Sequence, residues 1–149
     1  MKSIKLFLIL TIFLMSGCIN NKDNKIMIGE TCWIDGINGS IEPLVIISQY
    51  PIVFDGWAIN KLLQKAPSSV VIQLSNEKGL IEATIFSDEM LQRHDIAKVF
   101  GNQAYIKSGF KVLMNDLNKV PKGEYTISLI LNNEKTSMFC KIKNKILLN

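Results

Sequence analysis

Strict alternation of apolar and polar residues is the feature that most restricts the fold of this chain. Val70, Ile72 and Leu74 occupy every second position, so a strand would place all three on one face. Residues 81–85 and 125–131 repeat the pattern. A period of two is typical of β-strands that bury one face. The alternation therefore predicts β-sheets with a hydrophobic core on one side.

Turn residues divide the chain into short β-prone segments. Asp-Gly and Asn-Gly pairs within 35–39, and a further turn at Gly123, favour positive φ. We expect strands over residues 30–35, 44–50, 52–59, 69–75, 80–87, 109–114, 124–131 and 137–142. Residues 88–100 are expected to be helical, with Asp95 as a second N-cap. This pattern predicts one all-β domain, residues 26–149, folded as a two-sheet sandwich of about seven or eight strands with one short helix.

The start of the chain has the layout of an export signal. Lysines precede an apolar run, residues 6–15, that only one threonine interrupts, and two small residues then precede Cys18. This layout is typical of a cleaved signal peptide, and the run is too short for a helix that spans about 30 Å of hydrocarbon. The cysteine after the small residues resembles the lipobox of bacterial lipoproteins. The resemblance implies that a signal helix, residues 1–17, is removed and that Cys18 is acylated; the alternative is an ordinary secretory signal with an incidental cysteine.

A polar stretch follows this cysteine. Residues 18–25 contain too few apolar side chains to fold, so they are expected to be a flexible tether between the lipid and the domain. The membrane is then one partner of the protein. By resemblance to the sorting of enteric lipoproteins, Ile19 in place of an aspartate implies the outer membrane, at its periplasmic face.

Two cysteines, Cys32 and Cys140, remain once Cys18 is assigned to the lipid. In an exported chain an even pair favours a disulfide, which here would join the first strand to the last. Two buried free thiols are the alternative. These cysteines and the lone His94 are too few for a metal site, so we expect neither a metal nor a cofactor.

The charge of the chain argues against a nucleic-acid partner. The sequence has 17 basic and 13 acidic residues, and the loss of the two signal lysines leaves a balance near +2. Nucleic-acid interfaces need lysine and arginine concentrated on one face. Lys141, Lys143 and Lys145 alternate near the C-terminus, and we interpret them as a solvated strand face.

Four short motifs come in a recognisable order between residues 55 and 126. They are Asp55-Gly56-Trp57-Ala58, Arg93-His94-Asp95-Ile96-Ala97, Ser108-Gly109-Phe110 and Pro121-Lys122-Gly123-Glu124-Tyr125-Thr126. Together they resemble a bacterial β-sandwich module of the pattern GWA…RxDVA…GF…LxxGxY, which is appended to some cell-surface and glycosyltransferase-type membrane proteins. The resemblance implies an immunoglobulin-like, non-catalytic accessory domain. It also implies structural roles, in turns, core or the crossover between sheets, for Asp55, Gly56, Trp57, Arg93, Asp95, Gly109 and Phe110.

Candidate catalytic groups are few. His94 is the only histidine, and no nucleophile elbow or Ser-x-x-Lys motif accompanies it, so we expect an exposed helix residue. Asp35 and Asp55 each precede a glycine, where a role in a turn is sufficient. The sequence therefore favours a protein that is not an enzyme. A small periplasmic hydrolase is the hypothesis that it supports least.

Exposed aromatic rings are the candidates for ligand contact. Trp33, Tyr50 and Tyr105 could each present a ring to a sugar or a protein surface, whereas Trp57 is expected to anchor the core. The sequence as a whole predicts a non-catalytic envelope lipoprotein that binds a protein or glycan partner through loops at one end of the sandwich. The alternative is a periplasmic inhibitor or immunity lipoprotein that blocks a hydrolase or toxin.

Overall fold

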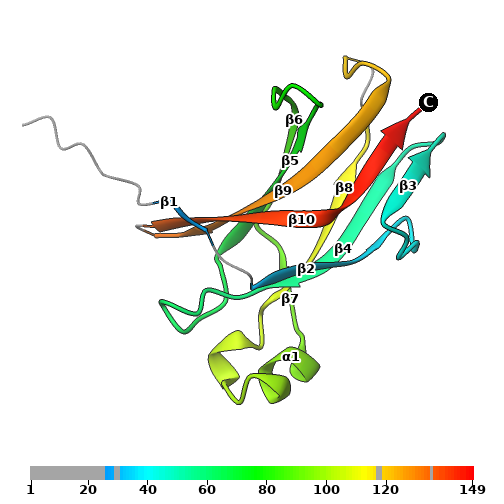
Figure 1. Cartoon of the computed structure of the whole chain (residues 1–149). Coiled ribbons are helices and arrows are strands. Elements are labelled where there is room, and N and C mark those ends of the chain that lie inside the picture. Colours follow the sequence, from blue (N-terminus) through cyan, green and yellow to red (C-terminus); the bar gives the residue numbers. More distant parts are fainter. Residues whose placement is uncertain (1–25, 29–30, 117–118, 135) are drawn as a thin grey trace, which may run out of the picture.

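The computed structural model describes residues 26–28, 31–116, 119–134 and 136–149. They form an immunoglobulin-like sandwich of two β-sheets with one short α-helix (Figure 1), which confirms the all-β fold predicted from the sequence. The strands are β1 (Ile26–Ile28), β2 (Cys32–Ile37), β3 (Leu44–Ile47), β4 (Ile52–Ala58), β5 (Ser69–Ser75), β6 (Ile81–Ser87), β7 (Met90–Leu91), β8 (Gly109–Met114), β9 (Gly123–Asn133) and β10 (Thr136–Leu148). The helix α1 (His94–Val99) and the 3₁₀ helix η1 (Gln103–Tyr105) lie between β7 and β8.

The chain moves between the two sheets several times. One sheet has the strand order β1-β10-β9-β5-β6, with β3 also paired to β10, and the other has the order β2-β4-β8-β7. β1 and β3 therefore belong to the first sheet, whereas β2, which lies between them in the sequence, belongs to the second. β6 and β7 also lie in different sheets, so the chain crosses over directly before α1.

The inward faces of both sheets supply the core. Alternate residues of β4, β5 and β9 are buried, as the alternation predicted for 70–74 and 125–131. The largest fully buried side chains include Phe54, Phe110, Ile52, Ile72, Leu74, Ile127, Leu129 and Leu131. Each side chain of this size contributes roughly 1.5–3 kcal/mol when it leaves water. The period of two in the sequence thus marks the faces that meet at the centre of the sandwich.

Strand β6 departs from the predicted alternation at its start. Ile81 was expected to face inward with Ala83 and Ile85, but its side chain is exposed. The pairing of β5 with β6 shifts register between Leu74 and Ser75, so that Ile81 lies opposite Ser75. Such a bulge turns the residues on one side of it to the other face of the sheet.

The helical region is shorter than predicted. Within the expected helix, Met90 and Leu91 instead form β7, which pairs with β8 at the edge of the second sheet, and α1 begins only at His94. Arg93 is the N-cap and Asp95 lies inside the first turn, so Asp95 is not the N-cap that we expected. A carboxylate there still faces the partial positive charge of the helix N-terminus favourably.

A tyrosine corner fixes the start of β9. The hydroxyl of Tyr125 donates a hydrogen bond to the backbone carbonyl of Pro121 at 2.6 Å, and its ring is buried. The same bond, from a tyrosine to the backbone a few residues upstream, is a hallmark of immunoglobulin-like sandwiches. Burial and the nearby Glu82 raise the pKa of this hydroxyl, so it stays protonated and remains a donor.

A disulfide between Cys32 and Cys140 joins the two sheets, which confirms the predicted pairing. The two Cα atoms are 6.4 Å apart, and the residues are 108 positions apart in the sequence. The bond links β2 of one sheet to β10 of the other. We expected the bond to join the first strand to the last. It joins the second strand to the last, because β1 precedes β2 and pairs with β10.

The export signal, Cys18 and the tether, residues 1–25, lie outside the described residues. Within the described part of the chain, no helix has the length and apolar character needed to cross a membrane.

Candidate binding site between β2 and β10

The long strand β10 has different partners along its two halves. Its first part pairs in parallel with β1 up to Phe139, and its last part pairs in parallel with β3 from Lys145 onward. On its other side it follows β9, but the register shifts between Lys141 and Lys145. Among the described strands, residues 142–144 therefore have no register partner on either side. This interruption is called the β10 gap below.

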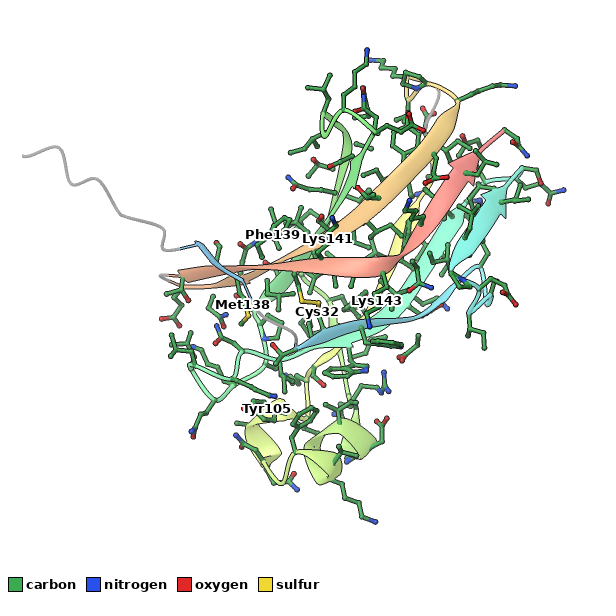
Figure 2. All side chains as sticks on the ribbon, in the orientation of Figure 1. Cys32, Tyr105, Met138, Phe139, Lys141 and Lys143 are labelled. Atoms are coloured by element: carbon green, nitrogen blue, oxygen red, sulfur yellow. A yellow bond between two sulfur atoms is a disulfide. The ribbon has the colours of Figure 1, made fainter. Side chains whose placement is uncertain are left out.

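A pocket of about 280 Å³ lies between the β10 gap and the edge of β2. Its lining consists of Cys32, Trp33 and Ile34 from β2 and Cys140, Lys141, Ile142, Lys143 and Asn144 from β10. Figure 2 shows the disulfide and Lys143 in the space between these two strands. Among the described strands β2 pairs only with β4, so its free edge faces this pocket. We call it the β2/β10 pocket.

Positive charge concentrates at the β2/β10 pocket. Lys141 and Lys143 are exposed, and among the described residues neither forms an ion pair. Lys145, two positions farther along, differs because its Nζ lies 2.6 Å from Oε1 of Glu124. That hydrogen bond raises the pKa of Lys145 and neutralises its field. Of the described residues that line the pocket, none is acidic.

Trp33 brings an exposed aromatic ring to the same place. It lies on the outer face of the second sheet, and half of its surface, 51 %, is accessible to solvent. Its register partner on β4 is Trp57. We expected Trp57 to anchor the core, but its side chain is only half-buried and does not anchor the main core. The ring of Trp57 packs against Phe100 after α1, with centroids 5.7 Å apart.

A network centred on Arg93 crosses the outer face of the second sheet. Its Nη1 donates to Oδ2 of Asp35 at 2.6 Å, and its Nε and Nη2 donate to the two oxygens of Asp95 at 2.9 and 2.7 Å. These bonds, those to Asp95 above all, raise the pKa of Arg93. The same hydrogen bonds from Arg93 lower the pKa of Asp95 to about 2. The arrangement ties the segment before α1 to β2, which is the kind of structural role implied for Arg93 and Asp95.

Two glycines provide the space that this architecture needs. A Cβ at Gly109 would lie 2.8 Å from Cγ of Arg93, and a Cβ at Gly56 would collide with the carbonyl oxygen of Trp33 and lie 2.6 Å from Cζ of Phe110. Phe110 is buried beneath Gly56, its register partner. Both glycines therefore allow close approach within the sheet rather than form a turn.

Asp35 and Asp55 do not lie in turns, contrary to our expectation for them. Asp35 is part of β2 and bonds Arg93, while Asp55 lies in the middle of β4 with its side chain on the outer face. Asp55 faces its register partner Lys111, and Nζ of Lys111 lies 3.8 Å from Oδ1 of Asp55. Cross-strand pairs of opposite charge stabilise a sheet modestly.

The three aromatic residues expected to contact a ligand lie in different environments. Trp33 lines the β2/β10 pocket and Tyr50 is exposed just before β4. Tyr105, by contrast, is buried in η1, in a small cluster with Ile59 and Ile96. Its ring meets Phe100 edge to face at 6.0 Å. Tyr105 is therefore a packing residue beneath α1 and is not available to a ligand.

His94 is exposed at the start of α1, where Nε2 lies 3.2 Å from Oε1 of Gln92. No carboxylate is recorded as its hydrogen-bond partner in the described part of the structure. Within the described ranges, no group of three or more histidine, cysteine, aspartate or glutamate residues is placed so that it could hold a metal ion.

A second hollow, of about 490 Å³, lies near the tyrosine corner. It carries charges of both signs, which come from Glu77, Lys78, Glu82, Lys122 and Glu124. Opposite charges this close cancel one another's field at a distance. Another hollow, of about 430 Å³, is lined by Thr126, Ile142 and the three lysines Lys141, Lys143 and Lys145, so Lys141 and Lys143 border both this hollow and the β2/β10 pocket.

Nothing in the sequence associates Lys141 and Lys143 with Trp33 or Asn144. The alternation of lysines was the only signal, and it is equally typical of a solvated face. The pocket depends on β1 and β3 both pairing with β10 and on the disulfide that brings β2 beside it. Contacts between residues more than 100 positions apart leave no local pattern in a sequence.

No protein-family model, curated protein or solved structure matches this chain. The function must therefore be argued from its own residues.

Proposed function

We propose that this protein is a non-catalytic lipoprotein of the bacterial envelope that binds a protein or glycan partner. The observation that carries the proposal is the β2/β10 pocket at a cross-linked edge of the sandwich. Its lining includes exposed Trp33 and two lysines that form no ion pair with any described residue. Unpaired charge beside an exposed aromatic ring is typical of recognition surfaces.

The anchor completes the proposal. Acylation of Cys18 would leave residues 18–25 as a link to β1, and each extended residue reaches at most about 3.6 Å. The sandwich would then work within a few tens of ångströms of the bilayer. The residue after Cys18 favours the outer membrane, with the domain on its periplasmic side. An oxidising compartment of this kind also suits the disulfide.

The environment of the carboxylates supports a non-catalytic role. Asp35 and Asp95 share Arg93, and Asp55 faces Lys111. The hydrogen bond from Arg93 keeps the pKa of Asp95 near 2, far below the value that suits a general acid or base at neutral pH. Acid–base catalysis would need one such group poised near the working pH.

The anchor is tested by growing cells with an alkyne-bearing fatty acid and comparing the parent with Cys18→Ala. We expect the label on the parent, recovered with the outer membrane, and no label on the variant. Recovery of unprocessed, unlabelled parent protein from the cytosol would contradict the proposal.

The binding role is tested by photo-crosslinking in intact envelopes. A photoreactive amino acid replaces Lys143 in one variant and Lys98, exposed on α1, in a matched control. We expect a discrete adduct at position 143 alone. One stoichiometric protein adduct would favour the inhibitor or immunity alternative, and a heterogeneous carbohydrate-bearing adduct would favour the accessory role. Identical patterns at the two positions would remove the β2/β10 pocket from the proposal.

A further inference from the structure

We infer that the β2/β10 pocket binds an anionic glycan, a sugar that carries carboxylate or phosphate groups. The inference rests on the proposed binding function and names the chemistry of the partner. Three properties of the pocket support it: its size, its charge and the kind of surface that its residues present.

The size of the pocket matches a compact ligand. Its volume of about 280 Å³ is just below the range of roughly 300–1,000 Å³ that sites for drug-sized molecules occupy. One or two sugar rings are therefore the natural occupant. The disulfide between Cys32 and Cys140 holds the two walls together, so the pocket is largely formed before the ligand arrives.

The charge of the pocket selects an anion. Lys141 and Lys143 have no ion-pair partner among the described residues, and the nearest lysine along the strand, Lys145, is already bound to Glu124. A lysine ammonium acts as a compact point charge with three hydrogen-bond donors, so it binds a carboxylate or a phosphate equally well. Two such groups two positions apart suit an anionic substituent on a ring.

Trp33 and Asn144 supply the contacts that a sugar needs. The half-exposed indole of Trp33 offers a flat apolar surface on which the C–H face of a ring packs by dispersion and by loss of apolar area to water. Asn144 donates from Nδ2 to the backbone carbonyl of Glu42 at 3.0 Å, which orients its amide. Its Oδ1 is then placed to accept a hydrogen bond from a sugar hydroxyl.

An acidic peptide that adds as a β-strand fits the site less well. On the edge of β10 that β1 and β3 share, residues 140–144 have no register partner, about 17 Å of strand. β1 occupies the edge of β10 up to Phe139, and β3 occupies it from Lys145. A peptide strand paired to β10 would be blocked at both ends, whereas a compact ring enters the pocket from the side. The free edge of β2 is the remaining place for such a strand, and the acidic peptide below tests it.

The experiment measures binding to full-length acylated protein in a neutral detergent by isothermal titration calorimetry. The carboxylate probe is digalacturonate, the phosphate probe is glucose 6-phosphate, and the neutral control is the methyl-esterified digalacturonate. A poly-glutamate peptide represents the acidic-peptide alternative. The variants are Lys141→Gln/Lys143→Gln, Trp33→Ala and, as a charge-matched control, Lys98→Gln. Thermal unfolding of each variant shows that it is folded.

We expect at least one anionic sugar to bind about tenfold more tightly than the neutral control. The double lysine variant should lose about tenfold in affinity, because two charge-assisted hydrogen bonds disappear. Trp33→Ala should weaken binding of the anionic sugar, Lys98→Gln should leave it unchanged, and added salt should weaken it. Preference for one of the two anionic probes identifies carboxylate or phosphate as the group recognised.

Several results would overturn the inference. These are no binding of either anionic sugar at millimolar concentration, equal binding of the neutral disaccharide, tighter binding of poly-glutamate, or full affinity in the double lysine variant. If neither anionic sugar binds but the crosslinker at position 143 still captures an envelope partner, the glycan inference is wrong and the proposed binding function stands. If no sugar binds and position 143 captures no partner, both the glycan inference and the proposed binding function are wrong.

Discussion

Nη1 of Arg93 lies 2.6 Å from Oδ2 of Asp35, although the two residues are 58 positions apart in the sequence. Arg93 follows β7 and Asp35 belongs to β2, and these strands are the two edges of the second sheet. The same guanidinium holds both oxygens of Asp95 at the start of α1. One side chain thus links the two edges of a sheet to the helix that follows the crossover.

Loss of the Asp95 carboxylate should change the acid stability of the protein. The hydrogen bond from Arg93 lowers the pKa of Asp95 from 3.8 to about 2 in the folded state. A lowered folded-state pKa stabilises the protein fully above the unfolded value of 3.8, and this contribution disappears as the pH falls through about 2. We expect Asp95→Asn to remove this part of the pH dependence, measured by urea unfolding at pH 6, 4, 3 and 2. An unchanged slope below pH 4 in the variant would show that Arg93 does not hold the carboxylate.

A side chain at Gly56 should disrupt the core beneath it. Its Cβ would collide with the Trp33 carbonyl and press on the ring of Phe110. We expect Gly56→Ala to lower the free energy of unfolding by about 1–3 kcal/mol, as overpacking generally does, measured by urea denaturation. Gly36→Ala is the control, because a Cβ there meets only ordinary contacts of 3.5–3.7 Å. Equal stability of the two variants would contradict this explanation.

Removal of the disulfide should destabilise the sandwich. The Cys32–Cys140 bond closes a loop of 108 positions, and bonds of this kind contribute about 2–5 kcal/mol, largely by restricting the unfolded chain. We expect Cys32→Ala/Cys140→Ala to lose stability in this range in urea unfolding. Reductant should destabilise the parent and leave the double variant unaffected. If it acts on both equally, its effect does not come from this bond.

The tyrosine corner should contribute a measurable part of the stability. Tyr125→Phe removes the hydrogen bond to the carbonyl of Pro121 while the ring still fills its buried site. We expect the free energy of unfolding to fall by about 1 kcal/mol, the usual contribution of one such bond. Tyr50→Phe, at an exposed tyrosine, should have no comparable effect. Equal effects of the two changes in urea unfolding would refute the role of the corner.

The predictable part of the fold is the part that depends on neighbours in the sequence. The alternation at 70–74 and 125–131 identified buried faces correctly, because successive residues of a strand point to opposite sides. The same reasoning failed at Ile81, where a bulge reverses the face, and at Met90–Leu91, where pairing with β8 converts the expected helix to a short strand. In both cases the deciding contact comes from another strand.

The candidate site shows the same division. Trp33 is exposed, as expected for a ligand-contact residue. Tyr105 was chosen because it follows the helical segment, but the packing of η1 against Ile59 and Ile96 buries it. Exposure of an aromatic ring in a loop depends on which residues from elsewhere in the chain pack over it. The local sequence does not show these contacts.

The β character of the chain and the residues available for each core face follow from local sequence patterns, which also favoured a bond between Cys32 and Cys140. Which strand edges meet follows from the folded structure: β1 and β3 share one side of β10, and the disulfide sets β2 against the β10 gap. The reason is physical. Alternation and turn chemistry act over a few residues, whereas the β2/β10 pocket arises from strands whose contacts span more than 100 positions of the chain.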